Sequence, residues 1–95
     1  MLFAEKIKRL REERQLLQRQ LAAALEIDTP MYSKIERGNR RAKREQIPII
    51  AEILQADEKE LLSLWLADQV TEVVEKDKEM SEMVLKIAKE NINQL

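Results

Sequence analysis

The stretch Gln18–Gly38 constrains the fold of this chain more than any other, because two short helical patterns meet in it across a tight turn. Two helices of about eight residues are not stable alone in water, so both must pack against other helices. The outer face of the second helix then remains free to contact a partner. Apolar residues recur at helical spacing on both sides of the turn: Leu21, Ala22, Leu25, Ile27, Tyr32 and Ile35.

The turn carries residues that begin and end helices. Asp28 and Thr29 are candidate N-caps, and Pro30 falls in the first helical turn, where its missing N–H costs least. Gly38 follows the second pattern, where a C-cap favours glycine. These signals predict a helix over residues 18–25 and another over residues 28–37.

This stretch resembles the lambda-repressor-like helix-turn-helix family, also called the XRE or Cro/C1 type. The resemblance covers roughly residues 7–66, and its most specific part is SKIERG followed by a basic loop. It implies an all-α fold: a five-helix DNA-binding domain over residues 1–66, with a C-terminal helical extension over residues 67–95. The residues that carry it are Leu16, Gln18, Leu21, Ala22, Ile27, Ser33, Lys34, Ile35, Glu36, Arg37 and Gly38.

The composition agrees with a helical chain and narrows its chemistry. One glycine, two prolines and 44% hydrophobic residues favour helices. The absence of cysteine and histidine excludes disulfides, imidazole bases and the usual zinc ligands, so we expect no enzyme, no metal and no cofactor. No apolar run approaches the roughly 18 residues of a membrane span. Met1 is followed at once by charged helix rather than a signal peptide, so we expect a cytoplasmic protein.

The net charge of −1 conceals two halves of opposite sign. Residues 1–44 hold 12 Lys or Arg and 6 Asp or Glu, a balance of +6, whereas residues 45–95 hold 5 and 12, a balance of −7. This division favours a nucleic-acid-binding face on the first half. The alternative is that the charges only solvate helices.

The first helix is predicted over residues 3–14, with Phe3, Ile7 and Leu10 on one apolar stripe. In the resembling family, an arginine at the position of Arg11 pairs with the glutamate that ends the recognition helix, here Glu36. The resemblance therefore implies a structural ion pair between these two residues. The alternative is two solvated charges.

The resemblance makes residues 28–37 the recognition helix, whose N-terminal residues face base edges in the major groove. Lys34 can donate to guanine, whereas Pro30 offers only apolar contact. Gln18, at the start of its helix, could contact a phosphate or be an ordinary surface residue. Met31 is open between groove contact and packing. We expect Tyr32 to lie mostly in the core, with its hydroxyl reaching water or a phosphate. The DNA-binding residues expected on this helix and before it are Gln18, Thr29, Pro30, Met31, Ser33, Lys34 and Arg37.

The segment GNRRAKR, residues 38–44, places four basic residues in seven after the recognition helix. Such a loop suits phosphate contacts, which position a protein on DNA and make its affinity salt-dependent. A solvated loop is the alternative. The DNA-binding residues expected here are Asn39, Arg40, Arg41, Lys43 and Arg44.

A fourth helix is predicted over residues 45–54, followed by a fifth with a capping box formed by Asp57 and Glu60. The fifth helix has more large apolar side chains than one face can bury. We expect Leu61 and Trp65 to be divided between core and dimer interface, and we place both among the dimer-interface residues. Full burial in the core is the alternative.

The tail from Ala67 continues an amphipathic pattern, interrupted by charges at residues 75–79. One continuous helix and two helices remain equally open. The tail could extend a dimer interface, wrap back on the domain or bind a second protein.

The sequence therefore predicts a homodimeric, sequence-specific regulator that binds double-stranded DNA, with repression and self-regulation as the simplest action. The alternative is an antitoxin or protein-interaction module whose C-terminal helices bind a partner protein. Phage repressors, restriction–modification controllers and antitoxins are the roles that the resemblance implies for so small a protein.

Overall fold

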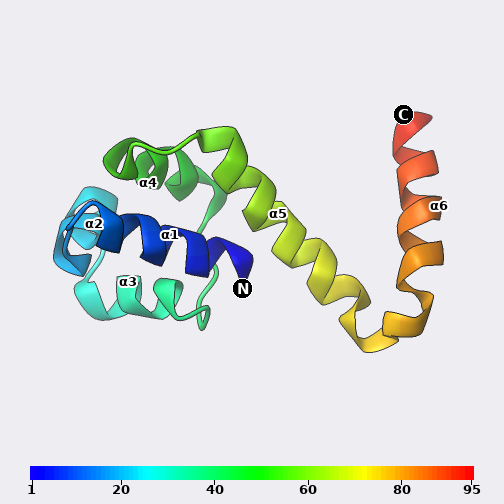
Figure 1. Cartoon of the computed structure of the whole chain (residues 1–95), viewed down its shortest axis with the longest axis horizontal. Coiled ribbons are helices and arrows are strands. Elements are labelled where there is room, and N and C mark those ends of the chain that lie inside the picture. The colour runs from blue at the N-terminus through cyan, green and yellow to red at the C-terminus, as the bar shows by residue number, and fades with distance from the viewer.

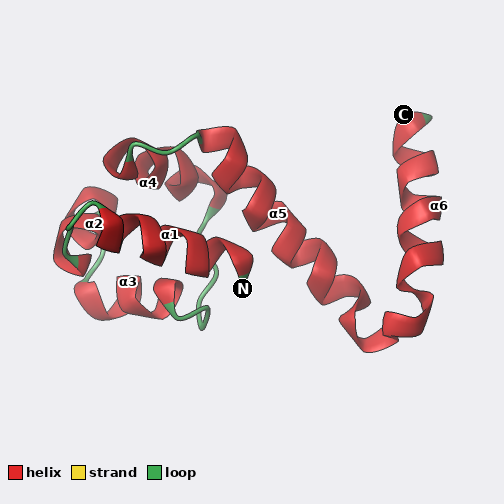
Figure 2. Ribbon diagram, in the orientation of Figure 1, coloured by secondary structure: helices red, strands yellow, loops and turns green.

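A computed structural model describes all 95 residues and shows helices joined by short turns, with no strand (Figures 1 and 2). This confirms the predicted all-α class, with five helices in the domain and a helical extension after it. The helices α1–α6 and the 3₁₀ helices η1 and η2 follow in this order: α1 Leu2–Glu13, α2 Gln18–Leu25, α3 Thr29–Glu36, η1 Arg44–Gln46, α4 Ile47–Leu54, α5 Glu58–Val74, η2 Glu75–Met80 and α6 Ser81–Asn93.

One hydrophobic core joins α1 to α5. Each helix turns one apolar stripe inward, and the α2–α3 and α1–α5 pairs make the most extensive contacts. Tyr32 is fully buried at the centre, as its predicted core position requires. The core residues are Phe3, Ile7, Leu10, Leu21, Ala22, Leu25, Tyr32, Ile35, Ala42, Ile47, Ile50, Ala51, Leu54 and Leu61.

The turn between α2 and α3 has the predicted chemistry. Asp28 is the N-cap of α3, and its carboxylate accepts from the Met31 N–H at 2.7 Å. Glu26, where the resembling family commonly has glycine, adopts the left-handed conformation with φ 57°. A residue with a Cβ adopts this conformation at a cost of about 1–2 kcal/mol, which the rest of the fold must offset.

The α4–α5 region corrects two expectations. The Asp57 carboxylate caps α5 through the Lys59 N–H, but Glu60 does not complete a capping box and instead forms an ion pair with Lys6 at 3.1 Å. Leu61, assigned to the dimer interface, is fully buried. It lies on the face of α5 that packs on α1 and α4, so it belongs to the core and leaves no surface for a partner.

Beyond the core, residues 67–95 form an arm that consists of the C-terminal part of α5, η2 and α6. Helix α5 runs without a break to Val74, so the division predicted between residues 66 and 67 falls inside a helix. Asp77 in η2 has non-helical angles. At this kink the chain turns back, and α6 stands apart from the domain (Figure 1). The tail is therefore two helices rather than one. No helix of the chain has the length and apolar character that crossing a membrane requires.

Candidate nucleic-acid interface

A buried ion pair joins helix α3 to α1. Arg11 of α1 donates from Nε to Glu36 Oε2 at 2.7 Å and from Nη2 to Glu36 Oε1 at 3.0 Å. Its third group, Nη1, donates to the Leu16 carbonyl at 2.9 Å. The side chain of Glu36 is 1% exposed and that of Arg11 is 12% exposed. This geometry is a bidentate pair with little contact to water, and it ties α1, the α1–α2 turn and α3 together.

The charges of this pair stabilise each other. Burial alone raises the pKa of the Glu36 carboxyl, but hydrogen bonds led by the one from Arg11 outweigh it and hold that pKa below its usual value. The hydrogen bond to Glu36 likewise raises the pKa of Arg11. Burial, with Glu36 close by, strongly raises the pKa of Tyr32, whose hydroxyl has no partner at hydrogen-bonding geometry. The hydroxyl is enclosed and does not reach water, contrary to the expectation for it.

Gln18 begins α2 as predicted, but its side chain is engaged inside the domain. Its Nε2 donates to Glu36 Oε1 at 3.1 Å, so the amide completes the coordination of the carboxylate. The side chain is half-buried. A phosphate contact predicted at this position would then rest on the free backbone N–H groups at the start of α2 and not on the Gln18 side chain.

The outer face of α3 is open. Thr29, Pro30 and Lys34 are exposed, while Met31 and Ser33 are half-buried. Arg37, the C-cap residue of α3, is also exposed. The exposed groups lie on the side of α3 away from the core residues Tyr32 and Ile35, which is the arrangement that major-groove insertion requires.

The basic loop, residues 39–44, starts from a Schellman motif. The Gly38 N–H bonds to the Ile35 carbonyl at 3.1 Å, and the Asn39 N–H bonds to the Lys34 carbonyl at 2.9 Å. Gly38 has φ +76°, and a Cβ added there would approach Met1 Cγ to 3.1 Å. Both conformation and space therefore favour glycine where the chain leaves α3.

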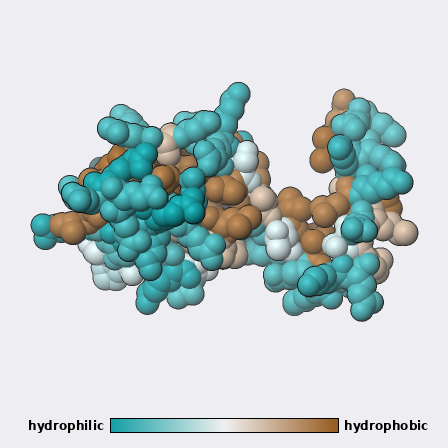
Figure 3. Space-filling view, viewed as in Figure 1, coloured by the Kyte–Doolittle hydropathy of each residue, from teal (hydrophilic) through white to brown (hydrophobic).

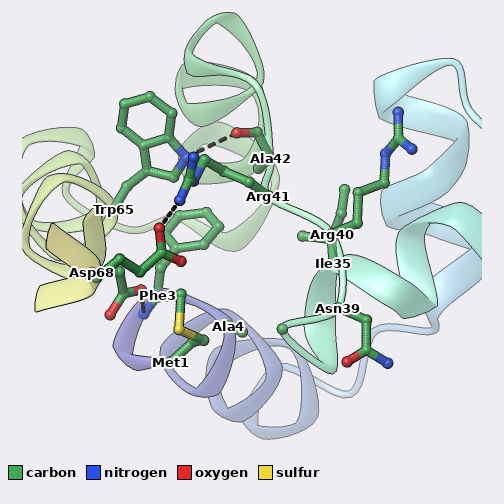
Figure 4. Close-up of a pocket in the computed structure, with 12 residues that line it drawn as sticks. Met1, Phe3, Ala4, Ile35, Asn39, Arg40, Arg41, Ala42, Trp65 and Asp68 are labelled. Carbon is green, nitrogen blue, oxygen red and sulfur yellow. Dashed lines mark hydrogen bonds and ion pairs between the residues drawn. The ribbon is translucent and has the colours of Figure 1, made fainter. Parts of the chain in front are cut away.

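Helix α5 contacts the middle of the basic loop through two side chains. The Trp65 indole N–H donates to the Ala42 carbonyl at 2.8 Å, and Ala42 itself is buried. Arg41 forms an ion pair with Glu72 of α5. Figure 4 shows these contacts around a hollow of about 210 Å³, with Arg40 pointing away from it. The half-buried Trp65 thus uses its N–H within the domain, and a dimer contact through it stays a prediction.

Two of these positioning residues have no local sequence signal. Asp68 of α5 is buried, and its two oxygens accept from the N–H groups of Leu2 at 2.9 Å and Phe3 at 3.0 Å. It caps the N-terminus of α1 from a distant part of the sequence, and its negative charge interacts favourably with the positive end of the α1 dipole. The second is Glu72, the partner of Arg41. Asp68 and Glu72 are spaced i and i+4 on α5, but this spacing is common on solvated helices and does not indicate a role for either residue.

Apart from Gln18 on α2, the residues expected to bind DNA lie on two adjacent segments, α3 with its C-cap and the basic loop. Arg40, Arg41, Lys43 and Arg44 are all exposed, as is Asn39. No cluster of acidic, histidine or cysteine side chains suited to a metal ion is present. The arrangement offers a helix for base edges and cations for phosphates.

A known family matches more than half of the chain. The family model described as a helix-turn-helix domain matches residues 2–64, which include α1 to α4 and the first turns of α5. The match ends before the arm. No curated protein and no solved structure shows significant similarity to the chain.

Proposed function

We propose, from the premise that this chain belongs to the helix-turn-helix domain family of the lambda-repressor-like superfamily, that it is a sequence-specific transcriptional regulator. It acts in the cytoplasm as a homodimer, with α3 in the major groove and the basic loop on the phosphates. Repression, including repression of its own gene, is the simplest outcome. The observation that carries the proposal is the open outer face of α3 beside an exposed cluster of four cations.

Base contacts would come from few side chains. Lys34 can donate to guanine O6 and N7, and the hydroxyls of Thr29 and Ser33 can serve several bases. Pro30 can pack against a thymine methyl group. The phosphate contacts of the basic loop would set register and supply most of the non-specific affinity.

Selection of binding sites from a random DNA library tests this proposal. A dimer with two α3 helices related by a two-fold axis should enrich an inverted repeat whose half-sites lie about 10 base pairs apart, or a multiple of that. The variant Lys34→Ala should enrich a motif with relaxed preference at one position of each half-site, since only its base contact is lost. Recovery of unenriched sequences by the wild-type protein would contradict sequence-specific recognition.

A second candidate function is favoured by the arm. The arm makes few contacts with the domain, and an antitoxin or interaction module would use it to bind a partner protein. Alanine at Arg40, Arg41, Lys43 and Arg44 discriminates the two functions. These changes should remove DNA binding in both cases, but should leave an arm-bound protein partner in place only in the second.

The ion pair between Arg41 and Glu72 gives a further prediction. In the free protein the Glu72 carboxylate pairs with the Arg41 guanidinium. A DNA phosphate that binds Arg41 must therefore compete with Glu72. The variant Glu72→Gln should raise the affinity for DNA by about fivefold to tenfold at 0.1 M salt and steepen the dependence of log K on log salt by about one unit. Titration of labelled DNA by fluorescence anisotropy at several salt concentrations measures both.

The matched control is Glu75→Gln, one turn further along the arm, which removes the same charge from an exposed residue without an ion pair. It should change affinity less than twofold. Equal gains from both variants would show a general charge effect and contradict competition at Arg41.

A further inference from the structure

Helix α5 carries two apolar stripes on opposite faces. One, which includes Leu61, packs on the domain. The other begins where the domain ends and is left uncovered: Val73 is 77% exposed and Val70 is 48% exposed. Its members follow one another at i, i+4, i+7 and i+8, the spacing of a helix face that packs against another helix. We call Leu66, Val70, Val73 and Val74 the α5 stripe.

Helix α6 has an even broader uncovered face. At 100° per residue its apolar side chains cover an arc of roughly 200°, and its charged residues Glu82, Lys86, Lys89 and Glu90 share the remainder. None of its residues is buried, and its only extensive contacts are with η2. A helix of this length is marginal alone in water, so its apolar face requires a cover. We call Met83, Val84, Leu85, Ile87, Ala88 and Ile92 the α6 face.

The two surfaces face each other across an open V. The kink in η2 sends α6 back alongside α5 but at a distance from it (Figure 1). Figure 3 shows hydrophobic side chains gathered on the facing sides of this V. A helix placed inside the V would contact the α5 stripe on one side and the α6 face on the other. It would cover only part of the 200° arc of α6.

We propose that the occupant is α6 of a second copy of this chain, so that two chains exchange their arms. Each copy supplies the same α6 and the same V, and a two-fold axis lets both be filled together. This inference rests on the proposed homodimer, for which it specifies the interface. It moves that interface from Leu61, which is buried, to the arm.

The extent and charge of these surfaces fit a second copy. An apolar side chain of this size removes on the order of 100 Å² from water when fully buried. The half-exposed members of the α5 stripe and the α6 face supply on the order of 500 Å² per copy. Two copies together reach the roughly 1,000 Å² that a specific interface needs. Residues 81–93 carry two lysines and two glutamates, so two copies of α6 do not repel each other.

Charge-complementary variants test the exchange. One variant carries Val70→Lys and Val73→Lys on the α5 stripe, and the other carries Met83→Glu and Ile87→Glu on the α6 face. Light scattering coupled to size-exclusion chromatography should find a dimer for the wild-type chain and monomers for each variant alone. A mixture of the two variants should restore a dimer, because lysines on one copy meet glutamates on the other. Ile49→Lys, which places a charge on an exposed apolar residue of α4, should remain dimeric.

A second readout uses the absence of cysteine from the chain. Mixed Val70→Cys and Ile87→Cys chains should form a disulfide-linked heterodimer under mild oxidation in higher yield than a mixture of Ile49→Cys and Ile87→Cys chains. A monomeric wild-type chain, dimers formed by either charged variant alone, or no recovery on mixing would overturn the exchange. A wild-type monomer would instead direct the search to a foreign protein as the occupant.

A result that contradicts the arm exchange can be distinguished from a result that contradicts the proposed DNA-binding function. The charged variants retain α3 and the basic loop, so they should bind non-specific DNA with salt dependence close to that of the wild-type chain, measured per chain. Loss of a two-site DNA complex with retained non-specific binding isolates the interface. A wild-type chain that dimerises but shows no DNA binding would leave the exchange intact and contradict the proposed function.

Discussion

Replacing Glu36 by alanine should destabilise the domain by about 3–5 kcal/mol, because it leaves the Arg11 guanidinium buried without its partner. Arg11→Ala should cost a similar amount, since the Glu36 carboxylate is 1% exposed and would lose both bonds from Arg11. Urea unfolding followed by far-ultraviolet circular dichroism measures both. Glu13→Ala is the matched control: Glu13 pairs with Arg9 at 3.9 Å on the surface, and its loss should change stability by less than about 1 kcal/mol.

The same pair gives a dependence on pH with a defined sign. The pKa of Glu36 is lower in the folded chain than its usual value of 4.5, so its contribution is fully present above pH 4.5. That contribution is lost as pH falls through the lowered pKa of the folded state. The wild-type chain should therefore lose stability in acid more steeply than Glu36→Gln. Equal acid slopes, or a loss below about 1 kcal/mol for Glu36→Ala, would contradict a buried and mutually stabilised pair.

Alanine at all four cations of the basic loop should weaken binding to DNA by about three to four orders of magnitude at 0.1 M salt. Each phosphate contact contributes a slope of about −0.9 to log K against log salt, or nearly tenfold in affinity at that concentration. The slope should become shallower by about three to four units. The four residues are Arg40, Arg41, Lys43 and Arg44, and the readout is titration of a labelled duplex at several salt concentrations.

A control with the same change in net charge is available on the arm. Lys76, Lys78, Lys86 and Lys89 are exposed and lie on η2 and α6, away from α3. Their replacement by alanine should leave the salt slope within about one unit of the wild-type value. Similar losses from both quadruple variants would show that overall charge, and not the position of the loop, governs the affinity.

The sequence predicted the part of the fold in which signals are local. Asp28 and Gly38 mark the two ends of α3 by cap chemistry, and both act as such in the structure. The Arg11–Glu36 pair joins residues 25 apart, and only the family resemblance pointed to it. Base-reading and phosphate contacts depend on the same resemblance, and they remain predictions.

What the sequence could not predict depends on the direction of side chains in α5. Large apolar residues surround this helix on most sides, so periodicity alone could not decide that Leu61 faces the core. Asp68 and Glu72 bond to groups that lie 66 and 31 residues away in the chain, and no local pattern encodes such contacts. The kink at Asp77 lies in the charged interruption that left one helix and two helices equally open. The glutamates and lysines around Asp77 are good helix formers, so propensity alone did not decide between them.

The most direct test of the central claim is the affinity of the purified chain for DNA from upstream of its own gene, compared with unrelated DNA of the same length. Fluorescence anisotropy at two salt concentrations measures both affinities. The account predicts roughly a 1,000-fold preference for the upstream DNA, with both affinities falling steeply as salt rises. Weak and equal binding to the two DNAs would contradict a sequence-specific, self-regulating protein and would assign the function to a protein partner of the arm.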